Sequence, residues 1–139
     1  MSTRAMYTFV DKHETHHVYK HSDGYPTPVE EGAYAHIERA KKYAWPLPRF
    51  EADEFAAAFV TANKIKQYED YPNSDKGMLG GGVRLMQSGD WQQVAPGDIA
   101  YRYEIRAVGK ELHVKGWDVD CWGDKCKETP LPDFVIKSS

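Results

Sequence analysis

Residues 13–17 have the sequence HETHH, which contains the H-E-x-x-H spacing of many zinc metalloproteases. That chemistry needs a helix, because a helix places residues i and i+4 one above the other, where both imidazoles can reach one ion. The surrounding sequence instead predicts a hairpin turn that leads into a strand. Along a strand, His13 and His17 would be separated by four residue rises, roughly 13 Å. We therefore interpret the motif as a chance match on a solvated, histidine-rich turn.

The segment GWDVDCWGDKC combines carboxylates and thiols within a few residues. Asp118 and Asp120 would lie on one face of a strand, where they could share a hard cation. Cys121 and Cys126 fall short of the four ligands of a structural zinc site, with only His113 as a plausible further ligand. We therefore expect two free thiols, which fit a reducing cytoplasm because no export signal is recognisable.

No other group of residues forms a known catalytic arrangement. The segment GGGVRL precedes a predicted strand rather than a helix, and it lacks the Lys-Ser/Thr pair of a phosphate-binding loop. No serine or cysteine occupies a recognisable nucleophile elbow. The sequence therefore predicts no catalytic residues, no metal ligands and no cofactor.

Exposed aromatic and arginine side chains are the usual anchors of protein interfaces, and several occur at suitable places in this chain. Tyr19 shares a predicted strand face with two histidines, and the polar loop that follows contains Tyr25. Arg102 lies on the polar face of a later strand, while Trp117 and Trp122 belong to the Asp- and Cys-rich segment. We predict that these five residues form the binding site. The alternative for Tyr19 is a half-buried position in the sheet.

The first half of the chain contains the pattern of two strands followed by two helices. Short aromatic and β-branched runs at 6–11 and 16–21 predict an antiparallel hairpin. A capping box at 27–30 predicts the start of a helix, which must end before the Pro46–Pro48 segment. A second helix is predicted from Glu51, because carboxylates are concentrated in its first turn.

The last third of the chain is predicted to be β-structure. Residues 99–107 alternate apolar and polar side chains, and Gly109 suits the first position of a two-residue turn. In the strand that follows this turn, apolar residues lie opposite apolar residues and polar residues opposite polar ones. This register places Gly116 opposite Tyr103. Apolar residues change phase after this glycine, which predicts a β-bulge there. A short strand at 83–87 and an edge strand near the C-terminal end complete the pattern.

The order ββ-αα-βββ predicts an α+β fold, with one antiparallel sheet of about five strands and two helices packed on one face. A length of 139 residues predicts a single domain over 1–139, with a mobile loop at 67–82 that is rich in turn-forming residues. The net charge of -3, without a basic stripe, argues against direct nucleic-acid binding. No apolar run is long enough to predict a membrane span.

Four segments together resemble a family of small, uncharacterised proteins carried by bacteriophages and prophages of Gram-negative bacteria. They are HVYKHSDGYP, AWPLPRFEADEFAAAFVTANK, GGVRLM and GDIAYRYEI. The resemblance spans roughly residues 7–120, and the chain differs from the family at 67–80 and in the HETHH turn. The family brings no established activity and no catalytic residues. What the resemblance implies is an accessory protein that is expressed in the cytoplasm of the host cell.

Our leading hypothesis is a non-enzymatic accessory protein that binds a host protein or protein complex, for example as an anti-CRISPR-like inhibitor of bacterial defence. One alternative is a small metal-dependent hydrolase that uses Asp118, Asp120 and histidines of the first hairpin. Another is a protein that sequesters a nucleotide-like ligand in an aromatic pocket. These hypotheses differ in what they require, namely exposed anchor residues, converging metal ligands or an aromatic cavity.

Overall fold

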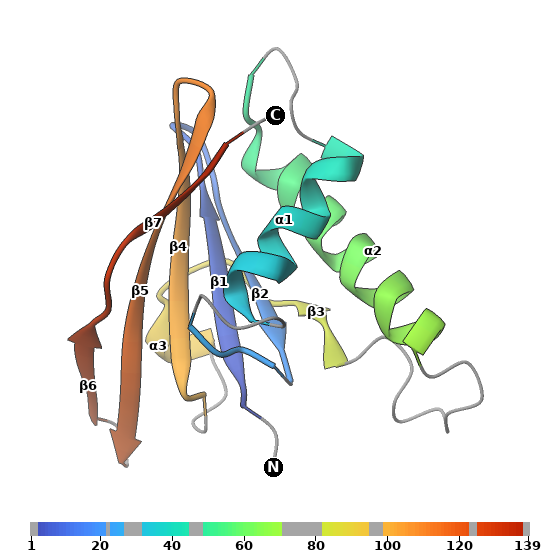
Figure 1. Ribbon diagram of the computed structural model, residues 1–139. Helices are drawn as coiled ribbons and strands as arrows, with labels where there is room; N and C mark the ends of the chain where they lie inside the picture. The colour runs from blue at the N-terminus through green and yellow to red at the C-terminus, as the bar shows by residue number, and fades with distance from the viewer. Residues whose placement is uncertain are drawn as a thin grey trace.

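The computed structural model has an α+β architecture, in which a twisted sheet carries two long helices (Figure 1). The structure describes residues 3–21, 23–26, 32–44, 49–70, 82–94, 99–122 and 125–137. The strands are β1 (Ala5–Val10), β2 (Thr15–Lys20), β3 (Arg84–Leu85), β4 (Tyr101–Val108), β5 (Glu111–Trp122), β6 (Lys125–Pro130) and β7 (Phe134–Lys137). The helices are α1 (Ala33–Ala44), α2 (Ala52–Asp70) and the short α3 (Trp91–Val94).

The seven strands form one sheet in the order β3-β2-β1-β4-β5-β6, and β7 pairs with the first part of β5. The pairing of β1 with β4 is parallel, while the other strand pairs are antiparallel. A parallel pair requires a long crossover, which the segment containing α1 and α2 supplies. The predicted α+β class is confirmed, but the sheet is larger than about five strands and is mixed rather than antiparallel.

The main core lies between the sheet and the two long helices, which cover one face of the sheet as predicted (Figure 1). Tyr7 and Phe9 of β1 are fully buried there. The ring of Tyr7 lies 4.6 Å from that of Phe59, and the ring of Phe9 lies 5.5 Å from that of Phe55. The two α2 phenylalanines are four residues apart, so they lie on the same side of the helix and direct it onto the sheet.

Some element boundaries differ from the prediction. Helix α2 continues to Asp70, so the first residues of the loop predicted at 67–82 are helical. Residues 71–81 and the capping box predicted at 27–30 lie outside the described residues. The strand predicted at 83–87 is shortened to the two residues of β3.

The β4–β5 hairpin has the predicted register. Gly109 opens its turn with a φ of 63°, and Gly116 lies opposite Tyr103. The predicted bulge is wrong, because the pairing continues without interruption beyond Gly116. Trp117 and Val119 instead point to the second face of the sheet, which has an apolar cluster of its own. The apolar residues of β5 thus change from one face of the sheet to the other after Gly116 because each face has its own apolar cluster there. No bulged residue is inserted.

This second cluster is smaller and is covered by α3 and the residues before it. Met6, Tyr19, Ile99 and Val119 are buried in it. The half-buried apolar residues that pack around them are Met86, Trp91, Val94, Trp117, Cys121 and Cys126. Strands β1 and β2 thus contribute buried side chains to both faces of the sheet, facing the long helices on one side and the α3 segment on the other.

Candidate functional site

The end of β5 forms a hairpin with β6 that extends past the start of β4 (Figure 1). We call residues 117–122 and 125–130 the stapled hairpin. Its pairs run from Trp117 opposite Pro130 to Trp122 opposite Lys125. Because side chains alternate along a strand, the hairpin has two rows of side chains on opposite faces. The inner row faces the second apolar cluster, which α3 covers and which we call the α3 cluster. The outer row points to the opposite face of the sheet.

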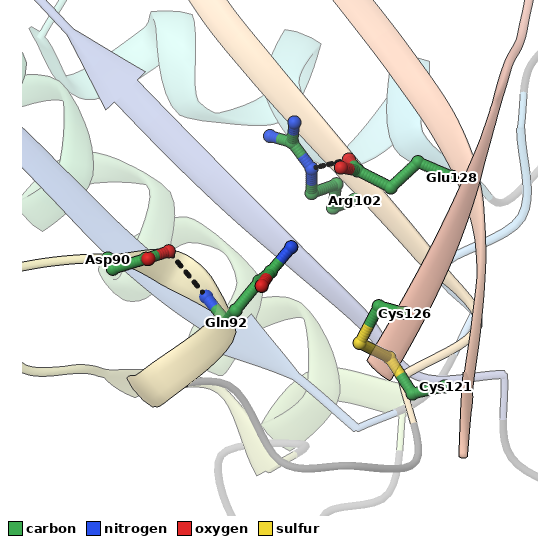
Figure 2. The surroundings of a disulfide bond; sticks show 6 residues. All are labelled: Asp90, Gln92, Arg102, Cys121, Cys126 and Glu128. Carbon is green, nitrogen blue, oxygen red and sulfur yellow. Dashed lines mark hydrogen bonds and ion pairs between the residues drawn. A yellow bond between two sulfur atoms is a disulfide. The ribbon is translucent and has the colours of Figure 1, made fainter. Parts of the chain in front are cut away.

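The inner row contains a disulfide between Cys121 and Cys126, which is shown with its surroundings in Figure 2. The two residues are directly opposite each other in the register, with their Cα atoms 4.0 Å apart. The prediction of two free thiols is therefore wrong. Antiparallel pairing brings the two side chains to the same face, which their spacing along the chain did not indicate. The disulfide joins the two strands close to the position of Trp122.

Arg102 of β4 contacts side chains of the inner row and so stabilises the position of the hairpin on the sheet. Its guanidinium lies 3.9 Å from the ring centroid of Trp117 and 4.7 Å from that of Trp91 in α3. Its Nε donates a hydrogen bond to Glu128 of β6, and a second nitrogen lies 4.0 Å from a carboxylate oxygen of Glu104. The Arg102 side chain is only 12% exposed. Water screens this ion pair weakly, and the cation–π contacts are correspondingly strong.

Sequence reasoning missed the contribution of Trp91, which supplies one side of this arginine stack. Asp90 caps α3, because its carboxylate accepts a hydrogen bond from the backbone N–H of Gln92 at 3.0 Å (Figure 2). The cap fixes the first turn of the helix and so orients Trp91 toward Arg102. An aspartate directly before Trp91 is the sequence signal that could have identified the start of this helix.

Three of the predicted binding residues are therefore not exposed anchors. Arg102 and Trp117 are engaged in the contacts that hold the inner row. Tyr19 lies in β2, as the alternative expected, but at 2% exposure it is fully buried rather than half-buried. Its hydroxyl hydrogen-bonds to His21 at 2.9 Å, and the guanidinium of Arg84 lies 5.0 Å from its ring centroid.

The other two predicted residues are exposed on the outer side. Trp122 ends the outer row and is 56% exposed, while Tyr25 is 40% exposed. The carbonyl of Gly24 accepts a hydrogen bond from the Tyr103 hydroxyl at 2.7 Å, which places the Tyr25 loop on the outer side of the sheet. Burial raises the pKa of Tyr103, so this hydroxyl stays protonated as the donor. The remaining exposed members of the outer row are Asp118, Asp120, Lys125, Lys127 and Thr129.

The carboxylates and histidines named for a metal-dependent hydrolase do not converge. Asp118 and Asp120 lie in the outer row, whereas His17 is buried on the opposite face of the sheet. The two ring nitrogens of His17 hydrogen-bond to Thr8 Oγ1 at 2.8 Å and to the carbonyl of Gly89 at 2.7 Å. Within the described ranges, no three His, Cys, Asp or Glu side chains are arranged to hold a metal ion.

The HETHH segment forms a turn and the start of β2, as predicted, rather than a helix. The expectation of solvated histidines holds for His13, but it is wrong for His17, which is only 3% exposed. Beside this turn lies a cavity of about 340 Å³. Its lining residues are mostly charged, with one phenylalanine, so it does not match the aromatic pocket expected for a nucleotide-like ligand. They are Asp11, Lys12, His13, Glu14, Arg49, Phe50, Glu51 and Asp53.

Asp11 has a structural role in this cavity, because it joins the turn to the start of α2. One carboxylate oxygen accepts the backbone N–H groups of His13 and Glu14, each at 2.7 Å. The other oxygen accepts the backbone N–H of Ala52 at 2.8 Å. These hydrogen bonds lower the pKa of Asp11 below its ordinary value of 3.8, the bond from Ala52 having the largest effect.

Replacing Asp11 by alanine is expected to lower the free energy of unfolding by about 1 kcal/mol at neutral pH, as for loss of a helix N-cap. The folded carboxyl has the lower pKa, so its ionised form contributes stability above the ordinary value of 3.8. That contribution is lost as the pH falls below this value. Urea denaturation at neutral pH and near pH 3 measures the difference, and Asp120→Ala controls for the lost charge. If the difference in free energy of unfolding between wild type and Asp11→Ala were as large near pH 3 as at neutral pH, this role would be contradicted.

Comparison of the chain with protein-family models, with curated proteins and with solved structures finds no match in any of the three. Among the described residues, no helix has the length and apolar character needed to cross a bilayer. The stapled hairpin is therefore interpreted from its own geometry.

Proposed function

We propose that this protein is a non-enzymatic binding protein, and that it binds a host protein or protein complex through the outer row of the stapled hairpin. In keeping with the phage-type resemblance of the sequence, its role is that of an accessory inhibitor of a defence component in the host cytoplasm. The observation that carries the proposal is Trp122. Its large side chain is 56% exposed on a strand whose backbone is held by a neighbouring disulfide.

An exposed tryptophan on a fixed backbone suits binding more than folding. The exposed part of the Trp122 ring leaves apolar surface in water, where it contributes nothing to stability. Tryptophan is among the residues that contribute most to protein–protein affinity when they enter a pocket of the partner. A backbone ordered before binding also loses less conformational entropy in the complex. The disulfide and the Arg102 contacts supply that order on the inner row.

The edges of the sheet favour binding through side chains over addition of a strand from the partner. Within the described part of the chain, β3 ends the sheet on one side and has only two residues, while β6 and the four-residue β7 form the other edge. Strand β6 carries two lysines, a glutamate and a terminal proline. Charged residues and proline are the features that prevent edge-to-edge pairing. The outer face of the hairpin is therefore the better candidate for contact.

The charges around Trp122 favour a protein partner. Asp118 and Asp120 on β5 lie beside Lys125 and Lys127 on β6, so both signs are present within the outer row. An aromatic centre with a polar rim of both signs is typical of protein interfaces. A phosphate backbone would instead require a basic excess. The expected partner surface thus has an apolar pocket for the indole and charges of both signs around it.

Affinity capture from a lysate of Gram-negative host bacteria, without reductant, tests the proposal. The wild-type protein, Trp122→Ala and Tyr43→Ala are immobilised in parallel. Tyr43 is a matched control, because it is an aromatic residue with 47% exposure on α1. We expect a host protein that wild type and Tyr43→Ala retain equally, and that Trp122→Ala retains about tenfold less, as for loss of a hot-spot residue.

The captured protein is then purified, and its affinity for the three variants is measured by calorimetry. The same order of affinities, with a difference of about tenfold for Trp122→Ala, would support the proposal. Equal binding by Trp122→Ala and wild type would contradict the assignment of the hairpin. Recovery of no specific protein by the wild type would contradict the function itself.

A further inference from the structure

We propose that the Cys121–Cys126 disulfide is a reversible redox switch that orders the end of the stapled hairpin and so controls the presentation of Trp122. The inference rests on the proposed function, since it concerns regulation of the same surface. The oxidised protein holds Trp122 in a fixed position, and the reduced protein does not. Disulfides in a reducing cytoplasm are usually transient or redox-sensing rather than permanent.

The disulfide lies where the hairpin has the least other support. The β4–β5 ladder extends to Asp118, and the N–H of Val119 still donates to the carbonyl of Ala100 at 2.9 Å. Within the described residues, β6 is the only strand that pairs with the three residues beyond Val119. Two-stranded ribbons are marginally stable in water. Loss of the disulfide is therefore expected to loosen residues 120–122 first.

The rest of the hairpin has contacts that do not depend on the disulfide. Trp117 stacks on the guanidinium of Arg102, and Glu128 pairs with the same group. Val119 is 5% exposed within the α3 cluster. These contacts hold the base of the hairpin in either redox state. The switch therefore acts on the segment that carries Trp122 and leaves the fold intact.

Both cysteines are half-buried rather than buried, so a reductant can approach them. A thiolate of a cellular dithiol attacks one sulfur of the disulfide and forms a mixed disulfide, which the second thiol of the reductant then resolves. The protein gains two electrons and two protons and becomes a dithiol, while the reductant is oxidised to its own disulfide. A disulfide oxidant such as oxidised glutathione reverses the step.

Amide hydrogen exchange of the 139-residue protein tests the switch without any partner. Addition of dithiothreitol to the native wild-type protein is expected to raise exchange at residues 120–122 about tenfold, because local opening there costs less free energy. Exchange at residues 112–117, which pair with β4, is expected to stay unchanged. Oxidised glutathione should restore the original protection. The variant Cys121→Ser/Cys126→Ser should exchange rapidly at 120–122 in both conditions.

Three results would overturn the inference. The first is a disulfide that dithiothreitol fails to reduce in the native protein, and the second is reduction that leaves exchange at 120–122 unchanged. The third is equal capture of the host partner by oxidised and reduced wild type, where about a tenfold loss on reduction is expected. The exchange readout needs no partner, so failure of the proposed function is distinguished from failure of the switch.

Discussion

Replacing Arg102 by alanine is expected to lower the free energy of unfolding by about 3 kcal/mol. The substitution leaves Glu128 without its cationic partner and opens a gap between the rings of Trp91 and Trp117. Removal of one partner from a buried ion pair costs about 3–5 kcal/mol, and each cation–π contact adds about 0.5–1 kcal/mol. The Glu128 side chain is 26% exposed, so in the variant water still solvates part of its unpaired carboxylate. The expected loss is therefore at the lower end of this range.

Urea denaturation followed by circular dichroism measures this loss, and two further variants separate its causes. Arg102→Lys keeps the charge but loses the planar stacking group. We expect it to lower the free energy of unfolding by about half as much as Arg102→Ala does. Arg106→Ala removes an arginine from the same face of β4, where it is 56% exposed and pairs with Glu104 at 2.8 Å. A loss below about 0.5 kcal/mol is expected for this control. Equal losses for Arg102→Ala and Arg106→Ala would show that the stack does not hold the hairpin.

Replacing Gly116 by alanine is expected to lower the free energy of unfolding by about 2 kcal/mol, although alanine suits a strand better than glycine. The added Cβ would lie 2.9 Å from Cδ1 of the Tyr103 ring. Tyr103 cannot move away easily, because it is 1% exposed and its hydroxyl is bound to the carbonyl of Gly24. Its ring centroid also lies 5.2 Å from that of Tyr7. The substitution therefore overpacks a rigid part of the main core.

A double-mutant cycle with Tyr103→Leu identifies the ring as the cause. Tyr103→Leu alone is expected to destabilise the protein, since it removes a buried aromatic ring and its hydrogen bond. In that background, Gly116→Ala should cost less than about 0.5 kcal/mol, which corresponds to a coupling of at least about 1.5 kcal/mol. An unchanged cost in both backgrounds would place the effect in the backbone instead of the ring.

The β4–β5 hairpin shows what short-range sequence determines in this protein. Its register was predictable because the two strands are adjacent in the chain and each pair matches in polarity. Gly109 occupies the turn position that needs a positive φ, which has little cost for glycine. The two long helices and the strand that begins in HETHH were predictable for the same reason. Their periodicity and local signals act over a few residues.

The disulfide and the parallel strand pair depended on contacts that periodicity does not contain. Cys121 and Cys126 lie opposite each other because β5 pairs with β6, a pairing that the sequence pattern did not reveal. The parallel pairing of β1 with β4 joins residues about 96 positions apart, as Ala5 with Tyr101. Such pairings are selected by the packing of the whole sheet against α1 and α2.

The sequence determined some features of the candidate site, and the tertiary structure determined the others. The sequence alone identified Trp122 and Tyr25 as aromatic residues in polar surroundings, and it placed Asp118 and Asp120 on one strand face. Only the tertiary structure decided that Trp122 is exposed while Tyr19 is buried. Alternation shows which residues share a face of a strand, but it does not show which face another part of the chain will cover. Here the α3 segment covers one face of the sheet near β6 and leaves the outer row of the stapled hairpin in contact with solvent.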